Sequence, residues 1–172
     1  MTVPTWVLTL SYWLHMLATV LWIGGLTAVS LLLIPVLQKK GETDNTTEQA
    51  AMLTRLQRGL DPLAWFSLLL LIATGLVQMS ASPQYEGFLA VTNRWSLAIL
   101  LKHIVFFSMI GVSAYLTWGN LPALQRAVLR QSRGKESPEL AALQRKNVLL
   151  LRANLLLAVI VLALTALARA SV

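Results

Sequence analysis

The chain has 172 residues, of which 56% are hydrophobic and only 12% are charged, and its mean hydropathy is +0.67. About a quarter of the residues of an ordinary soluble domain are charged, so this composition excludes a soluble enzyme, a disordered tail and a nucleic-acid-binding domain. The length allows one domain. Cysteine is absent, which excludes disulfides, thiolate zinc sites, iron–sulfur clusters and covalently attached c-type haem.

Two long uncharged runs occupy the first half of the chain. Residues 6–36 predict a transmembrane helix over about residues 5–37, which Pro35 kinks or ends. This run lacks a basic start and is longer than the apolar part of a signal peptide. The second run, residues 62–85, follows a polar segment with helical periodicity. Together they predict a helix over about residues 46–80 that bends at Pro62 and ends before Pro83.

Two further apolar runs occupy the second half. Residues 95–125 are interrupted only by Lys102, and residues 147–168 only by Arg152. They predict helices over about residues 93–131 and 138–169, separated by a turn that contains Gly134. The expected fold class is therefore an all-α integral membrane protein. Residues 1–172 would form a single domain, a four-transmembrane-helix up-down-up-down bundle with helices extended into the cytoplasm.

The basic residues are distributed unevenly among the connections. The loop between the second and third helices carries only Arg94, whereas the first and third connections carry Lys39, Lys40, Arg55 and Arg58, and Arg126, Arg130, Arg133, Lys135, Arg145 and Lys146. Cytoplasmic loops of membrane proteins carry such an excess of Lys and Arg. We therefore expect a multi-pass protein of the cell (inner) membrane of a bacterium, surrounded by membrane lipid, with both termini on the outer, periplasmic side.

Both histidines of the chain fall inside the predicted spans. His15 and His103 each lie about ten residues, or roughly 15 Å, from the outer ends of helices that run in the same direction. Intramembrane ionisable groups are functional hypotheses by default, and two imidazoles on facing helices can ligate a haem between them. The structural alternative is that each ring bonds a carbonyl or hydroxyl group of a neighbouring helix.

Three further residues belong to the predicted cofactor site. Lys102 or Arg94 could neutralise the haem propionates, and Trp22 shares a helix face with His15. The alternative for Lys102 is a lipid-headgroup contact. At the inner end, Arg152 and Asp61 are expected to pair as a structural clamp.

Copper is the alternative metal to haem iron. Cu(I) favours cysteine or clustered methionine ligands. The chain has no cysteine and no Met-x-Met pattern, which leaves His15 with Met16 or Met79 as the copper hypothesis.

Short motifs in all four predicted helices resemble the copper resistance protein D (CopD) domain family. They are Trp13-Leu14-His15, Trp22 and Gly24-Gly25 in the first helix, Ala73-Thr74-Gly75 in the second, Leu100-Leu101-Lys102 in the third and Arg152-x-Asn154 in the fourth. Asn154 stands where that family pattern has an acid. The layout is also similar to HemJ-type protoporphyrinogen oxidases, and that resemblance implies roles for His15 and Lys102.

Four functions follow as hypotheses. The first is a membrane protein that binds haem b through His15 and His103 and transfers electrons, alone or as a small subunit of a respiratory or photosynthetic complex. The second is copper uptake or resistance, as the CopD resemblance implies. The third is a HemJ-like oxidase with His15 and Lys102 handling protons, and the fourth is a cofactor-free scaffold subunit. Other membrane subunits or a second copy are the expected partners, and nucleic acid is not.

Overall fold

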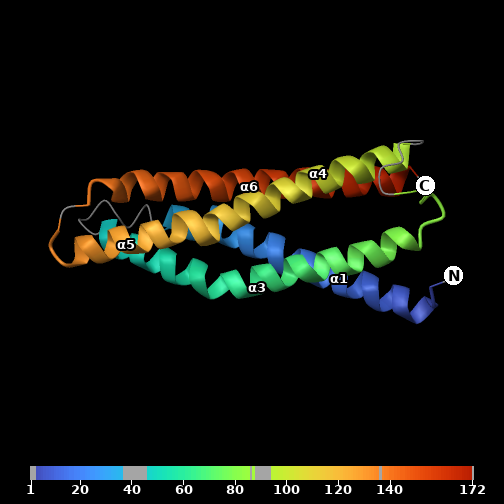
Figure 1. The fold of residues 1–172 in the computed structure, drawn as a ribbon, viewed down its shortest axis with the longest axis horizontal. Coiled ribbons are helices and arrows are strands. Elements are labelled where there is room, and N and C mark those ends of the chain that lie inside the picture. Colours follow the sequence, from blue (N-terminus) through green and yellow to red (C-terminus); the bar gives the residue numbers. More distant parts are fainter. Residues whose placement is uncertain (1–2, 37–45, 86, 88–93, 136, 172) are drawn as a thin grey trace.

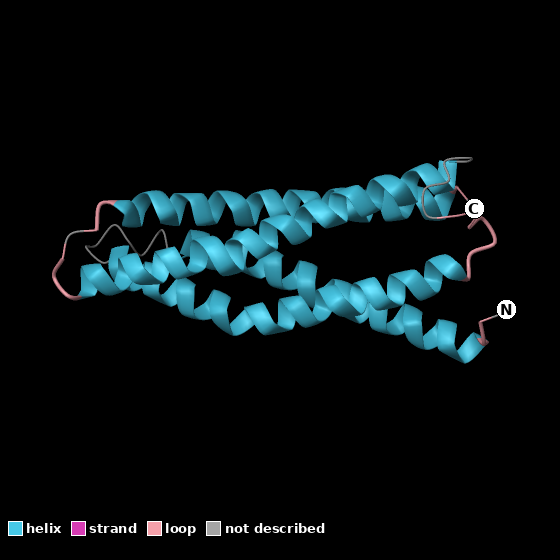
Figure 2. Cartoon of the chain, in the orientation of Figure 1, coloured by secondary structure: helices cyan, strands magenta, loops and turns pink. Residues whose placement is uncertain are grey.

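The computed structural model describes residues 3–36, 46–85, 87, 94–135 and 137–171, and these residues form helices and turns without a strand (Figure 2). Four helical spans among them are long and apolar enough to cross a membrane: Thr5–Val36, Thr47–Ser80, Arg94–Ser132 and Glu139–Ala170. The predicted all-α class and the four spans are confirmed. By length and composition, the chain is a multi-pass membrane protein.

Each span is continuous, but two of them change helix type along their length. The first consists of α1 (Thr5–Thr27) and a π-helical segment, η1 (Ala28–Leu33), and the second is α3 (Thr46–Ser80). The third consists of α4 (Arg94–Ala114), the π-helical η2 (Tyr115–Asn120) and α5 (Leu121–Ser132), and the fourth is α6 (Glu139–Ala170). These bounds agree with the predicted ones to within a residue or two, although the predicted end at Leu37 lies outside the described residues.

Each π-helical segment ends two residues before a proline. The Ile34 N–H donates to the Val29 carbonyl, five residues back, and Pro35 follows; the Leu121 N–H donates to the Leu116 carbonyl, and Pro122 follows. A proline inside an α-helix removes one N–H donor and clashes with the carbonyl four residues back. The wider turn rearranges the hydrogen bonds at that point, so the first span continues through Pro35 instead of ending there.

The helices pack as two close pairs. α1 lies along α3, and α4 lies along α6 (Figure 1). The two pairs lie apart at the end that carries both chain termini, whereas α5 packs against α3 and α6 at the opposite end. α3 changes direction along its length (Figure 2), and it contains Pro62, which interrupts the α-helical hydrogen-bond ladder as the sequence predicts.

The core is a row of three clusters of buried residues along the bundle. The cluster nearest the termini contains Ala18, Trp22, Leu68, Leu71, Met109 and Ala158, the middle one Val29, Ile34, Leu53, Leu116, Val148 and Leu151, and the far one Ala50, Leu124, Ala127 and Leu140. Many large apolar side chains point outward, among them Leu69 at 66% and Leu149 at 68% exposure. Such a surface suits lipid and not water.

Three buried amide side chains connect the third, fourth and second spans. Asn120 Nδ2 donates to Asn147 Oδ1 at 3.0 Å, and Asn147 Nδ2 donates to Gln57 Oε1 at 2.9 Å. All three residues are buried. Inside a membrane protein, amide hydrogen bonds of this kind hold helices together because the alternative is an unpaired polar group in an apolar medium.

Asn147→Ala should therefore destabilise the bundle by about 1–2 kcal/mol, because it leaves both Asn120 and Gln57 without their partner. Reversible unfolding in mixed micelles measures this loss. Leu149→Ala, two residues away on the exposed face of the same helix, is the matched control and should change the free energy of unfolding by much less. Equal effects of the two variants would contradict a stabilising role for the amide chain.

Candidate functional site

The imidazole of His15 is held by a threonine of the neighbouring helix. His15 Nδ1 lies 2.7 Å from Thr74 Oγ1, and the same hydroxyl group lies 2.6 Å from the Leu70 carbonyl, to which it donates. A hydroxyl group has only one proton. Thr74 therefore accepts from His15, Nδ1 carries a proton, and Nε2 is the nitrogen that holds the lone pair in the neutral ring.

His15 is one of four polar residues along the contact between α1 and α3. Ser11 Oγ donates to the Thr74 carbonyl at 3.1 Å, and Gln78 Nε2 donates to the Ser11 carbonyl at 3.2 Å. We call Ser11, His15, Thr74 and Gln78 the polar seam. A Cβ atom on Gly75 would lie 3.6 Å from His15 Cε1, so the ring rests against this glycine. The seam fixes the orientation of the imidazole.

Lys102 approaches His15 from the other helix pair. It lies on α4, it is partly buried, and it is close enough to His15 for an electrostatic interaction between the ammonium group and the ring. Arg169, on α6, interacts electrostatically with Lys102 in turn and lies over the Tyr12 ring, 5.2 Å from its centroid. The electrostatic surroundings of His15 thus include Lys102 of α4, and those of Lys102 include Arg169 of α6.

His103 lies on a different face of α4 from Lys102. Its Nδ1 lies 2.7 Å from the Ile99 carbonyl of the same helix, and a carbonyl only accepts, so this Nδ1 also carries a proton. Adjacent helical residues point about 100° apart. Lys102 lies four residues after Ala98 and seven before Met109, so it shares the face of α4 that carries these buried residues. His103 lies beside that face.

A ring contact fixes the relative level of the two histidines. Trp22 of α1 and Phe106 of α4 meet edge to face, with centroids 6.0 Å apart. His15 precedes Trp22 by seven residues and His103 precedes Phe106 by three, which corresponds to about 10 Å and 5 Å along the helices. The two histidines therefore differ in level by about 6 Å, whereas counting from the helix ends predicts a similar depth.

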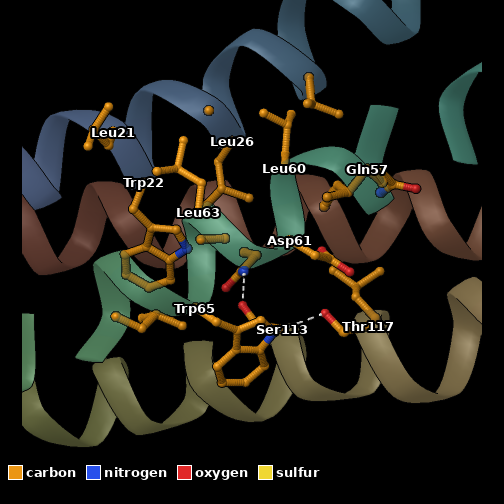
Figure 3. A pocket seen from close by; sticks show the side chains of 17 residues that line it. Leu21, Trp22, Leu26, Gln57, Leu60, Asp61, Leu63, Trp65, Ser113 and Thr117 are labelled. Atoms are coloured by element: carbon orange, nitrogen blue, oxygen red, sulfur yellow. Dashed lines mark hydrogen bonds between the residues drawn. The ribbon is translucent and has the colours of Figure 1, made fainter. Parts of the chain in front are cut away.

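Arg94 and Trp22 occupy different surroundings. Arg94 is the first residue of α4 and its side chain is exposed. Trp22 is buried and lines a cavity of about 90 Å³ (Figure 3). None of His15, Lys102, His103 and Arg94 lines this cavity.

The predicted clamp between Asp61 and Arg152 is wrong. Arg152 is exposed, whereas Asp61 is partly buried and interacts with the Thr117 side chain, and the described residues contain no ion pair to Asp61. Arg152 lies two residues before the buried Asn154, so helix geometry turns it about 200° away from that residue and toward the outer surface.

Sequence reasoning also missed Ser113, Thr117 and Arg169. Ser113 and Thr117 are spaced i, i+4 on one face of the third span, and this spacing in the sequence indicates a polar stripe.

The described residues contain no group of three or more His, Cys, Asp or Glu that could hold a metal ion, and Met16 beside His15 is 62% exposed. Copper binding stays a prediction.

Comparison with protein-family models, characterised proteins and solved structures finds no match for this chain. The resemblance to the CopD family and to HemJ-type oxidases stays a prediction, and the site has to be interpreted from its own residues.

The seam makes a spectroscopic prediction, because the protein contains only two histidines. In ¹⁵N-histidine NMR spectra both rings should carry a proton on Nδ1. Thr74→Val removes the acceptor of His15 and should perturb the signals of that ring alone. Thr19→Val is the matched control, since the Thr19 hydroxyl bonds only the His15 backbone carbonyl. A His15 signal that Thr74→Val leaves unchanged would contradict the hydrogen bond.

Proposed function

We propose that the protein binds a b-type haem in the membrane, with His15 and His103 as axial ligands, and transfers electrons alone or as a small subunit of a larger membrane complex. The observation that carries the proposal is the environment of His15. The Nδ1–H of His15 is bound by Thr74, and two cations, Lys102 and Arg169, belong to the same group of side chains.

Imidazole is a common axial ligand of an iron porphyrin. Ligating histidines generally donate the second ring N–H to an oxygen, which fixes the tautomer and orients the ring. His15 does so to Thr74 and His103 to the Ile99 carbonyl, so in the proposed site Nε2 would be the ligating atom of each. A bound b-type haem supplies one-electron chemistry, which the side chains of this chain do not provide.

The two cations fit the two propionates of the haem. Lys102 and Arg169 come from different helices and repel each other electrostatically, so a pair of carboxylates between them would remove that repulsion. The Tyr12 ring beneath Arg169 holds the guanidinium group at this end of the bundle. Arg94, at the start of α4, is a further cation of the same end.

The haem proposal is tested by the reduced-minus-oxidised visible spectrum of the protein purified from haem-sufficient cells. Wild type should show a sharp b-type band, and His15→Ala and His103→Ala should each abolish or strongly perturb it. Lys102→Ala and Arg169→Ala should retain the band but shift the reduction potential, because they act through charge and not through ligation. Ser108→Ala, exposed on α4, should be silent. A folded, colourless wild-type protein would contradict the proposal.

The proximity of Lys102 to His15 favours a second candidate, a HemJ-like protoporphyrinogen oxidase. In that enzyme His15 would accept a proton through Nε2. Lys102 would bind a substrate carboxylate or change the basicity of the His15 imidazole. The same variants separate the two functions. In the oxidase Lys102→Ala should abolish activity and His103→Ala should not, whereas the haem protein requires His103 and tolerates the loss of Lys102.

We further propose that the chain spans the inner membrane as an up-down-up-down bundle with both termini outside, because Lys and Arg concentrate in the first and third connections. A cysteine introduced at either terminus of this cysteine-free chain should react with an impermeant thiol reagent on intact spheroplasts. A cysteine at Arg133 should react only after permeabilisation. The reverse pattern would overturn this orientation.

A further inference from the structure

A second polar site lies on the far side of the Trp22–Phe106 contact from His15. It is a cavity of about 90 Å³ whose walls come from α1, η1, α3, the third span and α6 (Figure 3). Most of the wall is apolar, including Leu26, Leu68 and Leu151. The polar side chains that line it are Gln57, Asp61, Ser113, Thr117 and Asn154, together with the indoles of Trp22 and Trp65.

Within the described ranges, the carboxylate of Asp61 has no cationic partner. It is partly buried on α3, and it lies on the same side of the cavity as Thr117, whose hydroxyl group interacts with it (Figure 3). The basic residues Arg58 and Arg152 have exposed side chains, and the part of the chain that the structure describes has no ion pair to Asp61. A carboxylate in such surroundings requires compensation of its charge.

A second acceptor lines the same cavity without a partner. Asn154 is only 1% exposed, and its Nδ2 donates to Ser113 Oγ at 2.9 Å. Its carbonyl oxygen, Oδ1, is buried and accepts no hydrogen bond. A buried amide oxygen without a donor is costly, so an occupant that satisfies Oδ1 would bind favourably.

Part of the hydrogen-bonding capacity around the cavity is already used, since Trp65 Nε1 donates to Thr117 Oγ1 at 3.4 Å and Asn154 Nδ2 donates to Ser113 Oγ. The Asp61 carboxylate and Asn154 Oδ1 are the two acceptors that need compensation. A positively charged occupant would supply it for both, and oxygen ligands suit a hard cation.

Size and charge narrow the class of cation. About 90 Å³ corresponds to roughly three water molecules, well below the several hundred cubic ångströms of a pocket for an organic ligand. One carboxylate with neutral oxygens balances a single positive charge. The cavity therefore suits a monovalent metal ion with one or two waters.

The backbone around the cavity is irregular in three of its walls. Val29 belongs to η1, Leu116 and Thr117 belong to η2, and Asp61 directly precedes Pro62 in α3. Single π-helical turns occur frequently at functional sites, because they redirect side chains from the regular helical positions. This observation is independent of the unpaired oxygens and concerns the same cavity.

We propose that this cavity is a binding site for a small monovalent cation of the sodium class, held by the Asp61 carboxylate, Asn154 Oδ1 and the hydroxyl oxygen of Thr117 or Ser113. The site is distinct from the proposed haem site. Cation binding would connect α3, the third span and α6 at the level where the π-helical turns lie, and would stabilise the bundle by mass action.

The test uses the full-length protein in detergent at fixed pH and ionic strength, with NaCl replaced stepwise by N-methylglucamine chloride. The melting temperature should rise with sodium concentration in a saturable way, and the fluorescence of the cavity tryptophans should change over the same range. Asp61→Asn, which retains a partner for Thr117, should abolish both responses. Asn154→Ala should weaken the apparent sodium affinity about tenfold, because it removes one contact that is about as strong as a hydrogen bond.

Glu139→Gln, which removes an exposed carboxylate at the start of α6, is the matched control and should leave both responses intact. A melting temperature that is equal in sodium and in N-methylglucamine at this pH would overturn the proposal. That result would also be obtained if Asp61 were compensated by a proton and not by sodium. A sodium response that survives in both Asp61→Asn and Asn154→Ala would also overturn it. Since the haem spectrum of Asp61→Asn should equal that of wild type, this result is independent of the haem proposal.

Discussion

The structure depends on one constraint: polar side chains buried between apolar helices have no water and must find their partners inside the bundle. Thr74 meets this constraint for His15, and Asn147 meets it for Asn120 and Gln57. Each of these hydrogen bonds also fixes the rotation of one helix against another. The close pairing of α1 with α3 is therefore coupled to the orientation of the one imidazole that lies between them.

The two helix pairs contribute different chemistry to the end that carries the termini. The pair α1 and α3 supplies an oriented imidazole, and the pair α4 and α6 supplies the cations Lys102 and Arg169. A cofactor with a metal centre and anionic substituents matches this division, which is why a haem is our proposed ligand. The second candidate function depends on the same residues and differs in the requirement for His103.

Trp22 separates the two polar regions of the bundle. One side of its indole meets Phe106, and the residue also lines the cavity that contains Asp61. The buried residues around Trp22 come from all four spans, so the two helix pairs are packed together at this level. The proposed haem and cation sites can therefore be removed separately by mutation.

The sequence by itself determined the helix count, the boundaries and the membrane class, because a run of about twenty apolar residues has few alternatives to a membrane-spanning helix. It also singled out His15 and Lys102, since ionisable groups are costly inside a membrane. It did not determine which residues meet. Asp61 and Arg152 were expected to meet because they lie at a similar level of the bundle. Each residue along a helix is rotated by 100°, so a shared level does not fix the direction of a side chain. Arg152 faces outward and Asp61 faces a cavity. Only the tertiary structure could decide these faces, because helix rotation is set by packing between spans far apart in sequence.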